Sequence, residues 1–526
     1  GVQQTTDNDT PYTRGEDSGQ NQWTWQHYNA TVGYDGTFGR HVVSASAGIL
    51  YNIYKTDFSQ NGAAGKMVEY RHMTVNGAVN YAYDDRYVAT FSFAADGSDN
   101  YRPGNRWGFY PSLGLGWIVS RERFLRDSRT VDLLKLRASV GKNGWDPMGE
   151  MRYLWEGYYT GRGGLNTGNS EHTWHGGTAL SYLPNPGIFA EKSLKYDAGI
   201  DLRLWNRLSL NVDLFLEKRS GIVTQDWMIP GASGVDNPPY RNIGRMTNKG
   251  FEVQLSWADR IGDFNYALTG MASYNSNKVD YMAEVVTVPT AARTGRRLDA
   301  LFGYVADGFY DWDDFDVGGE LREGLPKPTF GAVQPGDIKY KNLNGDTVID
   351  ENDQTAIGDS YLPKLQYSFS LAASYKGFDL FALFQGAAGR DVNLLDAPLQ
   401  NIAFRDNGNV YGIAEGRWAY YPEQGIDTRA TATYPRLSLQ DNSNNYRNST
   451  LWKRSGDFLK LRNVELGYTF AQPSLSKAGI SKIRIYLSGV NLLTVSRLMR
   501  DYDIDPEILS GHPALKSYNL GLTVTF

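Results

Sequence analysis

Oxygen-bearing residues recur through positions 342–353 at the intervals found in calcium-binding loops. Ligand positions 1, 3, 5, 7, 9 and 12 of such a loop fall on Asn342, Asn344, Asp346, the Val348 carbonyl, Asp350 and Asp353. Hard oxygen ligands at this spacing wrap one Ca²⁺ ion, which would stiffen a long loop rather than catalyse a reaction. Two departures weaken the match, because asparagine replaces the usual first carboxylate and Thr347 stands where glycine allows the sharp turn. The alternative is a surface turn rich in Asx residues.

A second polar group lies in another long segment. His172 and His175 flank Trp174, but two histidines three positions apart without a third ligand are weak support for a metal site. A tryptophan that stacks on a sugar ring is the other functional interpretation. A solvated loop is the interpretation we favour.

Four carboxylates also lie close together in the sequence, at Asp311, Asp313, Asp314 and Asp316. A hydrolase needs a pair of carboxyl groups in different environments, and this spacing fixes no separation in space. We favour structural or solvated carboxylates. The chain also lacks HExxH, GxxxxGK[ST] and GxSxG motifs, and no GxGxxG follows a predicted strand. We therefore predict that the protein is not an enzyme.

The composition excludes several classes of protein. The 526 residues carry a net charge of −5 without a basic stripe, which argues against nucleic acid as a partner. The chain has no cysteine, which excludes disulfides and thiolate metal sites and fits an oxidising compartment. A run of about eighteen apolar residues, as a membrane helix requires, does not occur. The mean hydropathy of −0.47 still allows membrane strands, because only alternate residues of such a strand face lipid.

Alternation of apolar and polar residues is the dominant pattern of the chain. Residues 194–204 and 208–217 place charged side chains such as Asp201 and Asp213 on one face and leucines on the other. Charged residues cannot lie in a dry core, so this face must be wet and the leucines must point outward. The final segment, residues 518–526, repeats the pattern and ends on a phenylalanine, as outer-membrane β-barrels do.

The same pattern predicts fifteen strands, many of them about ten residues long, as a tilted membrane strand requires. They are predicted at residues 24–34, 42–53, 67–83, 87–95, 107–119, 133–141, 194–205, 208–217, 251–257, 264–272, 365–375, 378–384, 464–470, 483–487 and 518–526. Repeated two-faced strands with nothing to cover them favour an all-β fold, an antiparallel transmembrane β-barrel.

The connections between these strands agree with that fold. Short connections such as 84–86 and 376–377 alternate with long ones such as 277–364 and 390–454. Barrels with short periplasmic turns and long extracellular loops alternate in this way. Aromatic residues lie beside the short turns or at the terminus, and we interpret them as a periplasmic girdle: Tyr34, Tyr83, Tyr87, Trp205, Trp257, Phe264, Tyr375, Phe378, Phe470 and Phe526. Aromatic pairs in a soluble core are the alternative, but they would not need to gather at one end.

Several segments carry a family resemblance. Residues 87–98 read YVATFSFAADGS, residues 105–117 read NRWGFYPSLGLGW, and residues 337–346 read DIKYKNLNGD. Together with residues 133–141, 249–253, 458–468 and 488–494, and in this order, they resemble the SusC/RagA family of TonB-dependent outer-membrane transporters. The resemblance spans nearly the whole chain.

The resemblance implies a barrel of about twenty-two strands, closed by an N-terminal plug and capped by a SusD-like lipoprotein. Fifteen strands is an odd number, whereas single-chain bacterial barrels have an even number. We therefore predict that residues 1–526 form the C-terminal part of one transmembrane barrel domain that lacks the plug and the first strands. Parity then places the first loop, residues 1–21, outside the cell and Phe526 in the periplasm.

The functional prediction is a multi-pass protein of the outer membrane, surrounded by lipid, that imports oligosaccharides. The resemblance implies that it works with a SusD-like lipoprotein and with the TonB complex, which supplies energy through the missing N-terminal part. The alternatives are an importer of oligopeptides, an adhesin or enzyme anchored by a barrel, and a soluble glycan-binding protein. Outward-facing leucines argue against the last. The sequence names no residue that contacts substrate.

Overall fold

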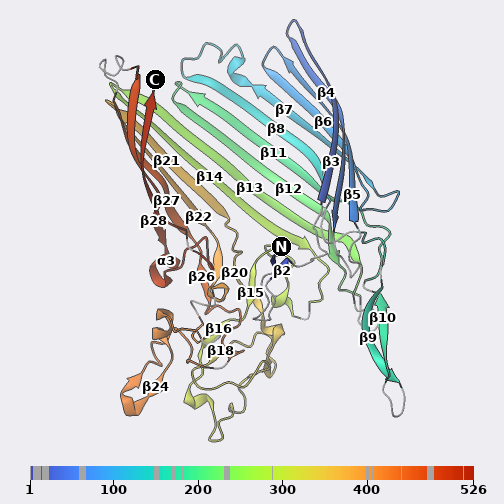
Figure 1. Ribbon diagram of the computed structural model, residues 1–526, viewed down its shortest axis with the longest axis vertical. Helices are drawn as coiled ribbons and strands as arrows, with labels where there is room; N and C mark the ends of the chain where they lie inside the picture. The colour runs from blue at the N-terminus through green and yellow to red at the C-terminus, as the bar shows by residue number, and fades with distance from the viewer. Residues whose placement is uncertain are drawn as a thin grey trace. The chain divides into compact units, whose positions relative to one another are not determined.

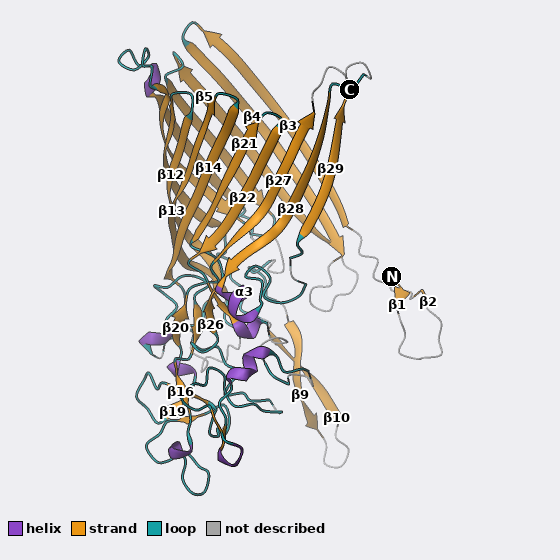
Figure 2. Ribbon diagram, turned by 90° about the vertical axis from the view of Figure 1, so that its left-hand side faces the viewer, coloured by secondary structure: helices purple, strands orange, loops and turns teal. Residues whose placement is uncertain are grey.

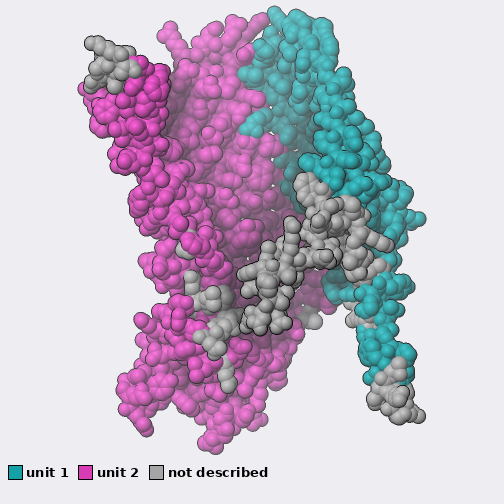
Figure 3. Space-filling model, viewed as in Figure 1, with its two compact units in different colours: residues 1–118, 137–196, 217–245 teal, residues 119–136, 197–216, 246–526 magenta. Residues whose placement is uncertain are grey.

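A computed structural model gives the fold of the protein. It describes residues 2–3, 13–14, 23–57, 67–146, 153–157, 159–167, 173–180, 182–229, 237–286, 288–397, 402–404, 408–439, 441–470, 479–512 and 514–526. The chain divides into two compact units (Figure 3). Unit 1 comprises residues 1–118, 137–196 and 217–245, and unit 2 comprises residues 119–136, 197–216 and 246–526. Within the described part of the chain, every helix falls short of the length and apolar character needed to cross a membrane.

One antiparallel sheet of fifteen strands holds most of the regular structure (Figures 1 and 2). Its strands are β3 (Trp23–Phe38), β4 (His41–Asp57), β5 (Met67–Tyr83), β6 (Tyr87–Ser98), β7 (Trp107–Ile118), β8 (Val131–Trp145), β11 (Glu191–Leu204), β12 (Leu208–Gln225), β13 (Tyr240–Ile261), β14 (Phe264–Tyr281), β21 (Leu365–Tyr375), β22 (Phe378–Ala388), β27 (Phe458–Phe470), β28 (Lys482–Ser496) and β29 (Ser517–Thr525). The hydrogen-bonded order is β29-β28-β27-β22-β21-β14-β13-β12-β11-β8-β7-β6-β5-β4-β3. Each strand therefore pairs with the sheet strands that precede and follow it in the chain.

The fifteen predicted strands are confirmed, with differences at their ends. Strand β13 covers 22 residues, although alternation predicts only 251–257, and β28 covers 15 residues instead of 483–487. Backbone pairing continues past the apolar alternation, because only the portion against lipid needs apolar side chains. The sequence analysis also missed a hairpin inside the expected loop 143–193, formed by β9 (Tyr159–Thr167) and β10 (Thr173–Leu180). This hairpin is rich in glycine and lacks the alternation.

Shorter elements occupy the long connections. The short strands are β1 (Val2–Gln3), β2 (Thr13–Arg14), β15 (Leu301–Gly303), β16 (Ala306–Phe309), β17 (Lys327–Pro328), β18 (Ile338–Tyr340), β19 (Val348–Ile349), β20 (Thr355–Gly358), β23 (Asp391–Asn393), β24 (Tyr420–Tyr421), β25 (Ile426–Asp427) and β26 (Lys453–Ser455). The helices of the described residues are α3 (Arg497–Tyr502) and the short 3₁₀ segments η2 (Val119–Arg121), η4 (Pro289–Ala291), η5 (Trp312–Asp314), η6 (Glu351–Asp353), η7 (Leu394–Asp396), η9 (Gly412–Gly416) and η10 (Pro422–Gln424).

The short turns set the register of the sheet. Tyr375 pairs with Phe378, so Lys376 and Gly377 alone connect β21 to β22, and both have positive φ. A two-residue hairpin turn needs a left-handed backbone at both positions to match the twist of its strands. Trp205 and Asn206 also have a left-handed backbone in the turn between β11 and β12. A slip of one residue at either turn would move every side chain of the strand to the other face.

The two faces of the sheet differ in chemistry. On β7 the exposed side chains are apolar: Trp107, Phe109, Leu113, Leu115 and Trp117. On β29, which ends the chain, Tyr518, Leu520 and Leu522 are each at least 65% exposed. Water would oppose the exposure of so much apolar surface, whereas lipid would cover it. The alternate positions carry polar residues and glycine.

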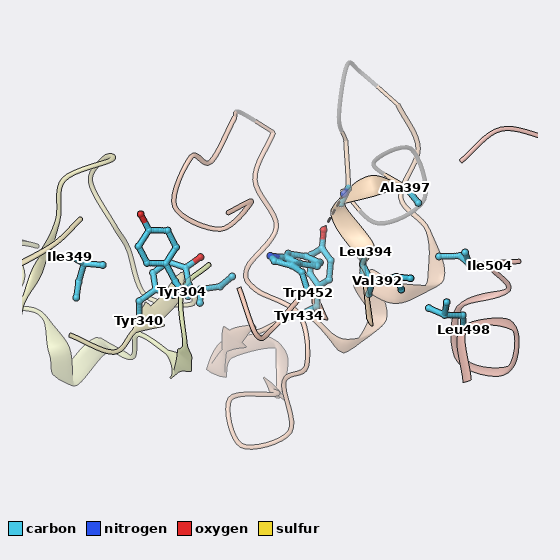
Figure 4. Packing of buried hydrophobic residues seen from close by; sticks show 13 residues of the cluster. Tyr304, Tyr340, Ile349, Val392, Leu394, Ala397, Tyr434, Trp452, Leu498 and Ile504 are labelled. Carbon is cyan, nitrogen blue, oxygen red and sulfur yellow. Dashed lines mark hydrogen bonds between the residues drawn. The ribbon is translucent and has the colours of Figure 1, made fainter. Parts of the chain in front are cut away.

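Unit 2 has its main hydrophobic core outside the sheet. The described residues of 282–364, 389–456 and 497–516, which we call the loop cap, bury a cluster that includes Tyr304, Ile338, Tyr434, Trp452 and Leu498 (Figure 4). Trp452 is only 1% exposed and meets Tyr434 edge-to-face, with 5.5 Å between ring centroids. The Nε1 of Trp452 donates to the Asn445 carbonyl at 2.7 Å. The three long connections therefore pack into one folded body.

Replacement of Trp452 by alanine should unfold the loop cap locally while the sheet persists. Removal of a buried tryptophan costs about 3–5 kcal/mol, which exceeds what a small core can lose without opening. Hydrogen exchange followed by mass spectrometry should show faster exchange in residues 301–358 and 391–455 and unchanged exchange in β14 and β21. Trp312→Ala is the matched control, because Trp312 is 56% exposed in the same unit. Equal exchange in both variants would contradict a core centred on Trp452.

Candidate functional site

The polar face of unit 2 carries a cavity of about 310 Å³. Five neighbouring strands, β12, β13, β14, β21 and β22, contribute to it. Its polar lining, which we call the polar wall, consists of Asn211, Asp213, Glu252, Gln254, Ser273, Gln366, Ser368 and Gln385. Register brings these residues together, since Ser273 pairs with Gln366 and Ser368 with Gln385. The arrangement offers amide and hydroxyl groups for hydrogen bonds with a polar solute.

A charged network lies on β22, β27 and β28 of unit 2. Arg484 donates through Nε to Asp379 at 3.0 Å and through Nη2 to Glu465 at 2.6 Å. Ionised groups on three adjacent strands require water or each other, so this face of the sheet is wet. The sequence predicts this from the alternation of charge and leucine.

One buried carboxylate organises the loop cap. Asp337 is fully buried and accepts hydrogen bonds from the side-chain amides of Asn442 at 2.9 Å and Asn445 at 2.8 Å. The Nε of Arg436 lies 2.7 Å from the same carboxylate. Burial of an unpaired charge would be costly, so these contacts fix connection 389–456 against connection 282–364. Asp337 begins the segment DIKYKNLNGD, and its neighbour Ile338 belongs to the cap core.

A buried lysine ties connection 497–516 to the sheet. Lys460, on β27, is fully buried, and its Nζ lies 2.7 Å from Asp505 Oδ1 and 2.7 Å from Glu507 Oε2. Arg462 also donates to Glu507. Burial favours the neutral form of Glu507, but the hydrogen bonds from Arg462 and Lys460 outweigh it and hold the pKa of Glu507 below its ordinary value. We call Lys460, Arg462, Asp505 and Glu507 the lysine clamp.

Unit 1 contains a comparable anchor at the end of β8. The Asp146 carboxylate accepts from Asn100 Nδ2 at 2.9 Å and Tyr101 OH at 2.8 Å, lies 3.2 Å from His72 Nε2, and accepts from Ser98 Oγ. Burial raises the pKa of Asp146, but the partners dominate and leave that pKa below its ordinary value. The anchor fixes the point at which the chain leaves the sheet.

The predicted calcium loop lies in the loop cap. Side chains of the set already accept hydrogen bonds from nearby backbone amides. Asn342 Oδ1 accepts from Gly345 at 2.6 Å, Asp346 Oδ1 accepts from Val348 at 2.9 Å, and Asp353 accepts from Leu343 and Asp350. Gly345, with φ of 79°, makes the sharp turn two positions before Thr347. Within the described ranges, no three acidic or histidine side chains gather as a metal-binding group. Calcium binding by this loop stays a prediction.

The other candidate residues do not form a common site. Trp174 is exposed on β10, and His172 lies outside the described residues. Asp311 and Asp314 cap η5 with reciprocal hydrogen bonds, and Asp316 accepts from the amides of Gly318 and Glu320. These carboxylates therefore have structural partners, as the favoured interpretation predicts.

Sequence analysis missed the polar wall and the lysine clamp. Gln254 and Gln366 lie 112 positions apart, and only the register of the intervening strands places them on one cavity. Lys460 alternates with leucines and looks like any other residue of the wet face. Its burial depends on a connection that starts 37 residues later. No local signal predicts either feature.

Replacement of Lys460 by methionine should release connection 497–516 from the sheet. Loss of one partner of a buried ion pair costs about 3–5 kcal/mol, because Asp505 would keep an uncompensated charge. Limited proteolysis should cleave this connection faster in Lys460→Met. Arg500→Gln is the matched control, since Arg500 and Asp501 form an exposed pair that solvent screens and that contributes little to stability. Restoration of protease resistance in Lys460→Met/Asp505→Leu would confirm that charge burial causes the loss.

The lysine clamp should also weaken in acid. Because the folded pKa of Glu507 is depressed, its contribution is complete above the ordinary value of 4.5 and disappears as the pH falls through the lower folded value. Cleavage of connection 497–516 by an acid-stable protease should accelerate over that range. In Glu507→Gln this Glu507-dependent part of the acceleration should be absent. The same pH profile in both proteins would contradict the role of Glu507.

Calcium binding can be tested at the exposed residue Asp346. Asparagine at this position keeps an oxygen for the Val348 amide but removes the charge that a cation requires. If the loop binds calcium, titration calorimetry of the EDTA-treated protein should give a binding heat that Asp346→Asn weakens at least about tenfold. Asp313→Asn, another exposed carboxylate of the loop cap, should leave it unchanged. Absence of a binding heat in the unaltered protein would show that the prediction is wrong.

Comparison with known proteins agrees with this architecture. The family described as TonB dependent receptor-like, beta-barrel, matches residues 1–492. TonB-dependent receptor P3 of Formosa agariphila is 26% identical over 94% of this chain and 51% of its own length. TonB-dependent receptor SusC of Bacteroides thetaiotaomicron is 25% identical over 86% of this chain and 43% of its own. The chain thus spans about half the length of the relatives it matches.

A solved structure shows the same fold. The RagAB peptide transporter superposes with a TM-score of 0.71 at 21% identity, over 96% of this chain and 55% of the chain it matches. The fold is accordingly an antiparallel transmembrane β-barrel, of which this chain supplies fifteen strands. The family consists of receptors and transporters rather than enzymes, and its barrels reside in the outer membrane. On this sequence match, spread over nearly its whole length, the chain belongs to the β-barrel family of TonB-dependent receptors.

Proposed function

We propose that this chain is the C-terminal barrel part of an outer-membrane importer of SusC type that takes up oligosaccharides. The polar wall is the observation that carries this proposal. Its eight residues include three glutamines, one asparagine and two serines, which donate and accept neutral hydrogen bonds. Sugar hydroxyls need partners of this kind in large number, whereas an anionic solute would need cations, which the described lining lacks.

The residues of the polar wall suit transport of a solute rather than a chemical reaction on it. Asp213 and Glu252 are its only carboxylates among the described lining residues. Ser273 Oγ donates to Glu252 Oε1 at 3.3 Å, but the described lining holds no histidine, lysine or arginine to assist such a pair. A solute held by many exchangeable hydrogen bonds can be bound and released along the wall. The TonB complex would supply the energy for release through an N-terminal plug, which precedes this part of the chain in the proposed whole protein.

The loop cap suits a role at the cell surface. Its own core and the buried carboxylate Asp337 make it a preformed body rather than a set of separate loops. We place the cap outside the cell and the short turns, together with Phe526, in the periplasm. A SusD-like lipoprotein would then rest against the cap and close over bound oligosaccharide. The predicted calcium ion would stiffen the part of the cap that contains residues 342–353.

Oligopeptides are the second candidate substrate. The likeness to the RagAB peptide transporter favours them, although 21% identity supports the fold alone. Backbone amides of a peptide could use the same glutamine and serine side chains. The two substrates differ in that a peptide also presents a C-terminal carboxylate, for which the described lining offers no cation.

Loss of two wall amides should reduce oligosaccharide uptake. Each neutral hydrogen bond contributes about 0.5–1.5 kcal/mol, so Gln254→Ala/Gln366→Ala should lower apparent affinity by about tenfold. The measurement is uptake of fluorescent oligosaccharides from starch, mannan and xylan by cells that make the complete protein and its native partners. Fluorescent oligopeptides are measured in parallel.

The matched control is Phe369→Ala. Phe369 lies on β21, as Gln366 does, but on the apolar face, where it is 45% exposed. Uptake in this variant should equal that of the unaltered protein. Uptake of peptides but of no oligosaccharide would overturn the proposed substrate and support the second candidate. Unchanged oligosaccharide uptake in the double glutamine variant would remove the wall from the transport path.

A further inference from the structure

The apolar face of unit 1 contains a pocket of about 380 Å³ on strands β4, β5, β6 and β7. One row of paired residues crosses these strands, from Tyr51 through Met73 and Gly97 to Trp107. Gly97 forms a low point in the row, and a Cβ atom there would lie 2.9 Å from the Trp107 ring. The pocket thus exists because Gly97 has no side chain, whereas its neighbours in the row across the strands, Met73 and Trp107, have large ones.

The pocket lies at one boundary of the membrane-spanning band. Strand β7 carries Trp107 near one end and Trp117 at the other, ten positions apart, with exposed Phe109, Leu113 and Leu115 between them. A tilted membrane strand needs about 9–11 residues, and tryptophan is enriched at both interfaces. Trp117 pairs with Tyr87 beside a short turn. Trp107 and the pocket therefore lie at the opposite interface, which faces outward in the orientation that we proposed above.

Charged residues form the rim of this pocket beyond the apolar band. On β5 the outward positions change from Val75 and Met73 to Arg71 and Glu69. Arg71 Nε donates to Glu69 Oε2 at 3.0 Å, and Lys55 on β4 pairs with the same carboxylate. Their two positive charges more than offset Glu69.

Arg106 completes the rim from the start of β7. Its Nε donates to the Tyr101 carbonyl at 3.0 Å, which holds the guanidinium beside Trp107. Asp99 lies on the same rim. Among the described residues that line the pocket, Arg71 and Arg106 against Asp99 leave a positive excess. Arginine presents a planar fork that matches the oxygens of a phosphate group.

Three kinds of group thus lie together at this pocket: arginine side chains, aromatic rings and the apolar band of the sheet. Arginine binds phosphate, the faces of Trp107, Tyr51 and Tyr153 can cover a sugar ring, and the band below accepts acyl chains. A soluble sugar or a free phosphate would use only part of this arrangement. We propose that the pocket binds the headgroup of a phosphorylated glycolipid from the outer leaflet of the membrane, with its acyl chains along Val75 and Phe109.

The proposal can be tested on the complete natural protein in detergent. Native mass spectrometry is used to titrate it with a monophosphorylated disaccharide lipid, with the same lipid after dephosphorylation, and with inorganic phosphate. Arg71→Gln/Arg106→Gln should weaken binding of the phosphorylated lipid at least about tenfold, because both charge-assisted contacts are lost. Trp107→Ala should weaken binding of both lipid forms, because it removes the ring rather than the charge.

Matched controls separate the site from general effects. Trp117→Ala removes the tryptophan at the other end of the same face, and Arg126→Gln removes an exposed arginine outside the pocket. Both variants should bind the lipid as the unaltered protein does. Circular dichroism melting verifies that each variant is folded, so that loss of binding is not loss of structure. Oligosaccharide uptake does not enter this measurement, and failure of the proposed transport function would leave it interpretable.

Three results would overturn the proposal. The first is unchanged affinity in the folded arginine double variant, and the second is equally tight binding of the dephosphorylated lipid. The third is displacement of the lipid by an equal concentration of inorganic phosphate, which would make free phosphate the ligand. Selective, arginine-dependent retention of the phosphorylated lipid would confirm the site.

Discussion

Pairing of backbone hydrogen-bonding groups between neighbouring strands is the constraint on which the rest of the structure depends. Lipid offers no partner to a peptide N–H or C=O, so each membrane-spanning segment must pair with its neighbours along its whole length. Strands β4 and β5 do so over 17 residues each without a break. Once this pairing is set, side chains have only two directions, toward lipid or toward the wet face. The sheet therefore has no dry core of its own.

The loop cap follows from that lack of a core. Long connections that leave a sheet cannot pack their apolar residues beneath it, so in unit 2 they pack against one another around Trp452 and Ile338. Buried charges then fix the arrangement, with Asp337 held by asparagines and an arginine and Lys460 held by two carboxylates. Such pairs add little net stability, but each is costly to break, which makes the arrangement specific.

The outward-facing side chains change from apolar to charged at the boundary of the membrane-spanning band. Below it the apolar face carries only lipid-compatible side chains, and the wet face carries the amides of the polar wall. At the boundary, a charged side chain on the outward face no longer has to lie in lipid, as the change from Met73 to Arg71 shows. Within unit 2, Lys460 lies ten positions before Phe470, the residue at the short-turn end of β27, and it meets the loop cap through Asp505.

The sequence by itself determined the number of strands, their faces and the place of the short turns, because period-two alternation and the breaks in it are local signals. It also predicted the family, from several short segments that occur in the family's order along the chain. Strand ends extended past the prediction, since pairing in β13 and β28 continues where lipid no longer demands apolar side chains. Only the tertiary structure decided which distant residues share a site. Gln254 meets Gln366, and Lys460 meets Asp505, through register and loop packing, and contacts of such long sequence separation leave no trace in any local pattern.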